Sequence, residues 1–195
     1  MRNVSERIKI IFLRQILLKM KKLIGLLSCM LVFTSCDDGD ITTKGVDFDP
    51  TAPVKSCTEN DGLYYKINGP EALILQTPPS SFLNEVTAEN QPRVILIDAN
   101  TKVVLRSFNA TVSDSYFCSV IPPSTPGVIE EWNALAGVPG QSGYMEIRTT
   151  AIVNSETQAI TGYNHNILFK NITFSNSKSS FVYDNYVYGN YTTNP

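Results

Sequence analysis

The chain has 195 residues, with 16 Lys and Arg, 18 Asp and Glu, and a formal net charge of −2. Seven of the basic residues lie upstream of Cys36, so the chain from Cys36 onward carries nine basic and seventeen acidic residues, a net charge of −8. An acidic body lacks the basic face that phosphate neutralisation requires, so we expect no nucleic-acid partner. The length suits one domain of ordinary size.

The first organised stretch is an export signal. Basic residues at 21–22 precede an apolar run at 23–33, and the small residues Thr34 and Ser35 stand just before Cys36. The apolar run is too short for a transmembrane helix, which needs about twenty residues. We therefore predict a signal peptide over residues 1–35, in which residues 1–19 are a start-site extension ahead of Met20.

The four residues Phe33-Thr34-Ser35-Cys36 resemble the lipobox of bacterial lipoproteins, with Phe33 where Leu is commoner. The resemblance implies that Cys36 is the first mature residue, that its thiol carries a diacylglyceryl group and that its new amino group is acylated. Membrane lipid is then a partner, because two or more acyl chains anchor a protein stably.

An acidic stretch follows the cysteine at once, with carboxylates at Asp37, Asp38 and Asp40. It resembles the sorting signal of surface lipoproteins in the Bacteroidota, and the string between Tyr116 and Trp132 is similar to segments of lipoproteins in the same group. The resemblance implies a lipid-anchored protein of the outer membrane that faces the cell surface. It brings no known activity.

Residues 36–56 are predicted to be a flexible, lipidated, acidic tether, because apolar residues such as Val46 and Phe48 are scattered there. The three aspartates at its start lack the ligand spacing of a calcium loop, and we expect no metal site. The folded domain is expected over residues 57–195.

Short apolar and aromatic runs separated by turn signals predict an all-β domain. Residues 98–101 suggest a hairpin between two of these runs, and residues 128–136 fit either a short helix or a strand. The expected strand runs cover residues 63–67, 72–75, 93–97, 103–105, 116–120, 144–153, 167–174 and 181–191. The fold we predict is a single β-sandwich. Its strand spacing also allows an immunoglobulin-like architecture, although the Cys–Trp–Cys order of true immunoglobulin domains is absent.

Two cysteines remain for pairing after Cys29 leaves with the signal and Cys36 is lipidated. Beyond the inner membrane the compartment is oxidising, so we predict a disulfide between Cys57 and Cys118. A loop of about sixty residues closed in this way constrains the unfolded chain by roughly 4 kcal/mol.

Catalytic motifs are weak throughout. His165 is the single histidine, and we interpret it as an exposed structural residue, since a catalytic base needs an orienting partner. Residues 140–143 form a glycine turn in which the spacing of a nucleophile elbow is broken. Glu130 and Glu131 are expected to be a solvated pair, because neighbours on a strand point to opposite faces. We predict no cofactor and no catalytic residue.

Aromatic side chains concentrate in residues 181–191. Tyr183, Tyr186 and Tyr188 could stack on a sugar or cover the edge of a core, and packing is the commoner role of such residues in strands. These three tyrosines are the best candidates that the sequence offers for a contact surface.

Two functional hypotheses stay open. The first is a non-enzymatic envelope lipoprotein that binds a glycan or an envelope protein or has a structural role. The second is a small glycan hydrolase, in which Glu130 or Glu131 would face Asp114 or Glu146 across a cleft. Two facing carboxylates would favour the enzyme, and an aromatic patch without them would favour the binding protein.

Overall fold

The computed structural model describes residues 45–58 and 60–195. The predicted signal, Cys36 and the three sorting aspartates Asp37, Asp38 and Asp40 lie outside the described residues. The described residues belong to one compact unit, Lys44–Pro195. None of its helices is long and apolar enough to cross a membrane.

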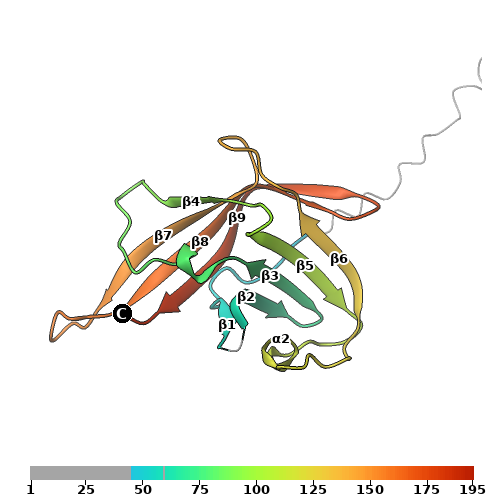
Figure 1. Ribbon diagram of the computed structural model, residues 1–195, viewed down its shortest axis with the longest axis horizontal. Coiled ribbons are helices and arrows are strands. Elements are labelled where there is room, and N and C mark those ends of the chain that lie inside the picture. The colour runs from blue at the N-terminus through green and yellow to red at the C-terminus, as the bar shows by residue number, and fades with distance from the viewer. Residues whose placement is uncertain (1–44, 59) are drawn as a thin grey trace, which may run out of the picture. The chain divides into compact units, whose positions relative to one another are not determined.

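Strands dominate this unit (Figure 1). In chain order the elements are β1 (Lys55–Cys57), β2 (Asn60–Asn68), β3 (Glu71–Gln76), η2 (Pro79–Ser81), β4 (Arg93–Leu96), β5 (Lys102–Phe108), α2 (Asp114–Cys118), β6 (Val128–Ala134), β7 (Tyr144–Val153), β8 (Ile160–Ser175) and β9 (Ser180–Thr193). The all-β class predicted from the sequence is confirmed.

The strands of the described residues form one antiparallel sheet in the order β1-β2-β3-β5-β6-β8-β7-β4, with β9 paired to β8. Residues 163–170 of β8 pair with both β7 and β9, so these two strands lie on opposite edges of β8. The sheet curves so that the segment just before β1 meets β9, where the Val54 amide donates to the Asn190 carbonyl at 2.9 Å. The two sandwich-like layers are therefore halves of one continuous sheet, whereas an immunoglobulin domain has two separate sheets.

A large hydrophobic core fills the space inside the curved sheet. It brings together side chains from both ends of the described chain, from Val46 to Leu105 and from Trp132 to Tyr188. Fully buried members include Leu73, Leu105, Ile147 and Phe169. Residues that alternate in sequence along each strand supply this inner face, as a pleated strand requires.

A smaller core lies on the outer face of β2, β3 and β5. Leu63 and Tyr65 point outward from β2, while Tyr64 points into the inner core. The strands β2 and β3 are thus covered on both faces, which explains why residues 72–75 are apolar without alternation. The helix α2 covers this outer core (Figure 1).

The segment before β1 belongs to the folded domain. Val46, Phe48 and Val54 are buried against the inner core, and only the part of the predicted tether before residue 45 lies outside the described residues. The expected domain boundary at residue 57 is therefore too late. Three apolar residues among polar ones gave too weak a pattern to reveal this packing.

A buried lysine fastens this segment to the sheet. Lys66 is 3% exposed, and its ammonium donates to the Asp49 carbonyl and, at 3.0 Å, to the Tyr188 carbonyl. Burial lowers the pKa of Lys66, and the Asp49 carboxylate partly counters this effect. Lys66 therefore joins the N-terminal segment, β2 and β9 at the place where the sheet closes.

Three local predictions need correction or completion. The run 116–120 is not a strand, because residues 114–118 form α2, which begins with an acidic residue suited to a helix N-terminus. The hairpin across 98–101 is also wrong, since β4 pairs with β7 and β5 pairs with β3. Asp98 does make a turn, accepting hydrogen bonds from the amides of Asn100 and Thr101. Of the ambiguous segment 128–136, residues Val128–Ala134 form the strand β6.

Candidate functional site

The candidate site is a groove beside α2, which we call the α2 groove. Its volume is about 330 Å³, at the lower end of the roughly 300–1,000 Å³ of small-molecule pockets. It combines an apolar floor, an aromatic wall and a polar rim. The lining residues are Leu63, Ile74, Gln76, Val104, Arg106, Tyr116, Phe117 and Pro122.

Strand register places the floor and the rim. Ile74 lies opposite Val104 in the β3–β5 ladder, and Gln76 and Arg106 are each two residues further along their own strands. Residues two apart share one face, so all four side chains are on the outer face. The floor is buried, while the Gln76 side chain is exposed and Arg106 is half-buried.

The helix α2 supplies the wall. The Phe117 ring stacks on Tyr65 with centroids 4.5 Å apart, and Tyr116 meets Phe108 edge-on at 5.0 Å. Phe117 is buried by this packing, whereas Tyr116 remains half-buried and borders the groove. A helix of five residues is not stable alone, so these contacts and a covalent link must hold it.

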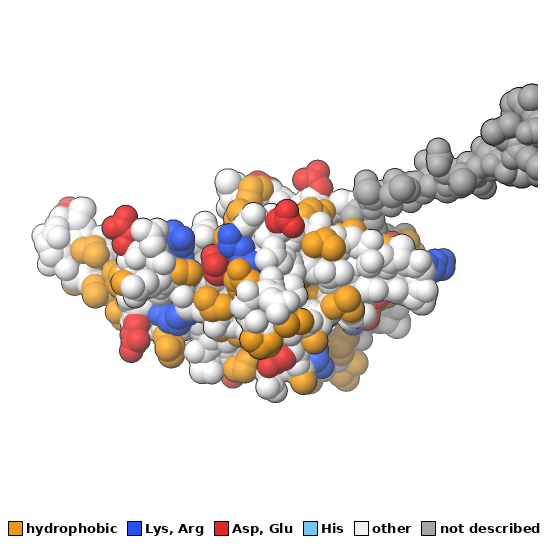
Figure 2. Space-filling model, turned by 90° about the horizontal axis from the view of Figure 1, so that it is seen from above, with side chains coloured by type: hydrophobic (Ala, Val, Ile, Leu, Met, Phe, Trp, Pro, Cys, Tyr) orange, Lys and Arg blue, Asp and Glu red, His pale blue; other side chains and the backbone are white. Residues whose placement is uncertain are grey.

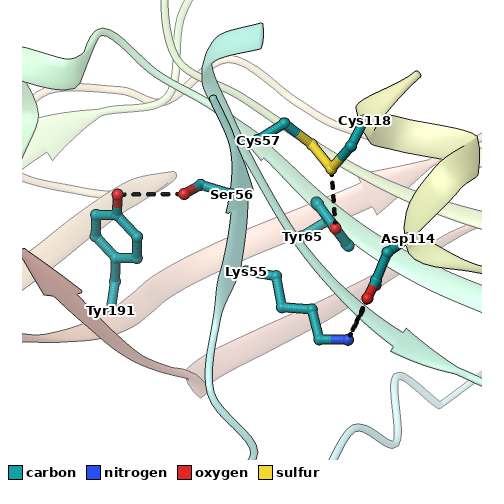
Figure 3. The surroundings of a disulfide bond; sticks show 7 residues. All are labelled: Lys55, Ser56, Cys57, Tyr65, Asp114, Cys118 and Tyr191. Atoms are coloured by element: carbon teal, nitrogen blue, oxygen red, sulfur yellow. Dashed lines mark hydrogen bonds and ion pairs between the residues drawn. A yellow bond between two sulfur atoms is a disulfide. The ribbon is translucent and has the colours of Figure 1, made fainter. Parts of the chain in front are cut away.

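That link is the disulfide between Cys57 and Cys118, and its prediction is confirmed (Figure 3). It joins the end of β1 to the end of α2, with the two Cα atoms 5.2 Å apart. The Tyr65 hydroxyl lies 3.2 Å from the Cys118 sulfur. Burial, reinforced by the nearby Asp114 carboxylate, raises the pKa of Tyr65 to about 12.

Around the disulfide, two polar contacts add support. The Lys55 ammonium donates to both carboxylate oxygens of Asp114 at 2.9 Å, which ties β1 to the first turn of α2. On the other side of β1, the hydroxyls of Ser56 and Tyr191 are 3.3 Å apart. Figure 3 shows that Lys55 and Ser56 point away from each other, as neighbours on a strand should.

The charged rim of the groove is built across β5 and β6. Arg106 Nε donates to Glu131 Oε2 at 2.7 Å, and the Asn133 amide donates to Glu131 Oε1 at 3.1 Å. Partial burial raises the pKa of Glu131, but these hydrogen bonds outweigh it and the pKa lies below its usual value. Glu131 is therefore ionised at neutral pH, and among the described residues the two terminal nitrogens of Arg106 have no hydrogen-bond partner.

The tyrosines proposed as a contact surface lie elsewhere and face inward. Tyr186 is 8% exposed and Tyr188 is fully buried, so neither can contact a partner in this fold, and their prediction as binding residues is wrong. The Tyr183 hydroxyl accepts a hydrogen bond from the Val46 amide at 2.6 Å. These tyrosines of β9 instead supply large side chains to the inner core.

His165 is also placed differently from the prediction. It is fully buried rather than exposed, with Nδ1 2.8 Å from the Thr149 hydroxyl and Nε2 3.0 Å from the Thr193 hydroxyl. Burial, with a smaller effect of Arg93, lowers the pKa of His165 to about 4. Its polar neighbours in sequence suggest a surface turn, but they lie within β8, which is paired on both sides there.

The carboxylates named for a hydrolase are dispersed. Asp114 pairs with Lys55, and Glu131 pairs with Arg106. Glu146 lines a separate cavity of about 400 Å³ on β4 and β7, beside Tyr144. Within the described residues, neither this cavity nor the α2 groove is lined by two carboxylates.

No three His, Cys, Asp or Glu side chains gather as a metal site in the part of the chain that the structure describes. On the face shown in Figure 2, basic and acidic side chains are interspersed, with small apolar groups between them.

Sequence reasoning missed the groove residues Gln76, Arg106 and Tyr116. They lie on β3, β5 and α2, which the sequence does not place side by side. The alternation of Val104, Arg106 and Phe108 was a usable signal that Arg106 shares a face with apolar residues.

Comparisons of this chain with protein-family models, with curated proteins and with solved structures give no match. The chemistry of the α2 groove therefore carries the functional conclusion.

Proposed function

We propose that this chain is a lipid-anchored lipoprotein of the outer membrane whose β domain binds a glycan in the α2 groove without transforming it. Acylated Cys36 is the anchor, and Asp37, Asp38 and Asp40 direct the protein to the cell surface. The single observation that carries the binding role is the composition of the groove. An aromatic wall and apolar floor suit the C–H face of a sugar ring, and a polar rim suits its hydroxyl groups.

The surrounding sheet favours a glycan over an extended peptide. A peptide that adds a strand needs an unpaired sheet edge, because its main chain must form ladder hydrogen bonds. At the groove floor, Ile74 on β3 and Val104 on β5 are each paired to neighbouring strands on both sides, so this part of the sheet offers no free edge. Recognition in the groove must come from side chains, and rings bearing many hydroxyl groups satisfy that requirement.

Binding is tested with a fragment of residues 37–195, which retains every residue of both described cores. We expect the fragment to bind members of a glycan array and Tyr116→Ala to lose most of that binding. Tyr163→Ala is the matched control, since Tyr163 is a half-buried tyrosine on β8 outside the groove. Equal binding by the two variants, with both folded by circular dichroism, would contradict the proposed site.

The anchor has an independent test. Cys36→Ser should release the protein from membranes, because the acyl chains can no longer be attached. Replacing Asp37, Asp38 and Asp40 with Ala should leave the protein lipidated but shielded from protease added to whole cells. Complete membrane partitioning of Cys36→Ser would show that another element anchors the chain.

A further inference from the structure

Two basic side chains, Arg106 in the α2 groove and Lys102 beside it, stand on one face of β5. Lys102, Val104 and Arg106 alternate along β5, so the two cations share the outer face with the groove floor. Lys102 lies directly opposite Gln76 in the β3–β5 ladder, and Gln76 lines the groove. The side chain of Lys102 is exposed, and no described residue forms an ion pair with it.

Arg106 is held so that part of its guanidinium group is free. Its Nε is occupied by Glu131, which fixes the plane of the group against β6. The two terminal nitrogens form another edge of the group, which can donate two parallel hydrogen bonds to a carboxylate. Arg106 is itself one of the residues that line the groove.

Acidic groups near the groove offset only one of these two cations. Glu131 pairs with Arg106, and Asp114 is paired with Lys55, which leaves the charge of Lys102 uncompensated by a described ion pair. Asp61 lines a neighbouring cavity that shares Leu63 and Gln76 with the groove. No carboxylate is among the side chains that line the groove itself.

We propose that the glycan bound in the α2 groove is acidic, with a sugar carboxylate held by the terminal nitrogens of Arg106 and attracted by Lys102. This inference rests on the proposed function and names its substrate class. The sugar ring lies against Tyr116 and the apolar floor, and the Gln76 amide contacts a hydroxyl group. Arg106 is then the residue that selects acidic over neutral sugars.

The test measures affinities of the 37–195 fragment by calorimetry. The probes are oligosaccharides ending in glucuronate, galacturonate or N-acetylneuraminate, each compared with its carboxyl-reduced form. We expect at least one acidic probe to bind roughly tenfold or more tightly than its reduced form, which corresponds to a hydrogen bond to a charged group. Added salt should reduce the difference in affinity between the acidic probe and its reduced form, because salt screens charges.

Two variants identify the residue responsible. Arg106→Gln should abolish the preference for the acidic probe while preserving the weaker binding of the reduced form. Lys102→Gln, at an exposed site, should reduce the preference without risk to the fold. Arg148→Gln is the matched control, since Arg148 is an exposed arginine on β7.

The outcomes separate the two proposals. Equal binding of acidic and reduced probes, lost in Tyr116→Ala, would overturn the acidic class and leave glycan binding intact. A preference that survives both Arg106→Gln and Lys102→Gln would also overturn it. Binding of none of the probes, acidic or reduced, would overturn both proposals.

Discussion

The two faces of the sheet are stabilised in different ways. Nineteen buried residues fill the inner core, whereas nine form the outer core beneath α2. The inner core is enclosed by the curve of the sheet itself and includes no disulfide among its described residues. The outer core is covered by a five-residue helix and a disulfide.

The difference shows where this fold needs a covalent link. A large core can order its own elements through burial, but a short helix over a small core cannot compensate its ordering entropy. The groove lies on the weaker face, and its wall depends on α2 staying in place. The disulfide therefore keeps the wall of the proposed site in place, while the inner core stabilises the domain as a whole.

The largest expected effect comes from removing that link. Replacing Cys57 and Cys118 with Ser should lower the free energy of unfolding by roughly 4 kcal/mol, because the unfolded chain gains the freedom of a closed loop. Urea denaturation of the 37–195 fragment measures the loss. A reductant should destabilise the original fragment by a similar amount and leave the double variant unchanged. Insensitivity of the original fragment to reductant would contradict this account of the outer core.

The inner face should respond to acid instead. Burial lowers the folded-state pKa of His165 to about 4, below the usual value of 6.5 for a free histidine, so the unfolded state binds the proton more readily. Its contribution to stability is complete above pH 6.5 and is lost as the pH falls toward 4, by roughly 3 kcal/mol.

The His165 prediction is checked by unfolding the fragment and its His165→Gln variant between pH 7 and pH 4. Carboxylates titrate in both proteins, so the difference between the two curves isolates the histidine. The original fragment should lose stability faster than the variant. Parallel curves would show that His165 does not titrate in this interval.

The smallest effect should come from the polar support of α2. The side chains of Lys55 and Asp114 are 48% and 53% exposed, so solvent screens their ion pair. A double-mutant cycle with Lys55→Gln and Asp114→Asn should give a coupling below about 1 kcal/mol. A coupling comparable with the effect of the disulfide would mean that the helix is held by charge rather than by the covalent link.

The sequence predicted what depends on local pattern and on elimination. Alternating residues indicate the strands, and the predicted loss of Cys29 and lipidation of Cys36 leave Cys57 and Cys118 as the expected pair. It could not reveal which strands are neighbours, so the apolar run 93–97 was assigned to a hairpin that does not form. For the same reason the burial of His165 and Tyr188, and the meeting of Gln76, Arg106 and Tyr116, required the structure.

The most direct test of the central claim is a nuclear magnetic resonance titration of the isotope-labelled 37–195 fragment with an acidic oligosaccharide from the calorimetric panel. The account predicts that the largest amide shift changes cluster at Gln76, Val104, Arg106 and Tyr116, with little change around Val94 and Tyr144 at the other cavity. Shift changes concentrated at Val94 and Tyr144, with the α2 groove unaffected, would contradict it.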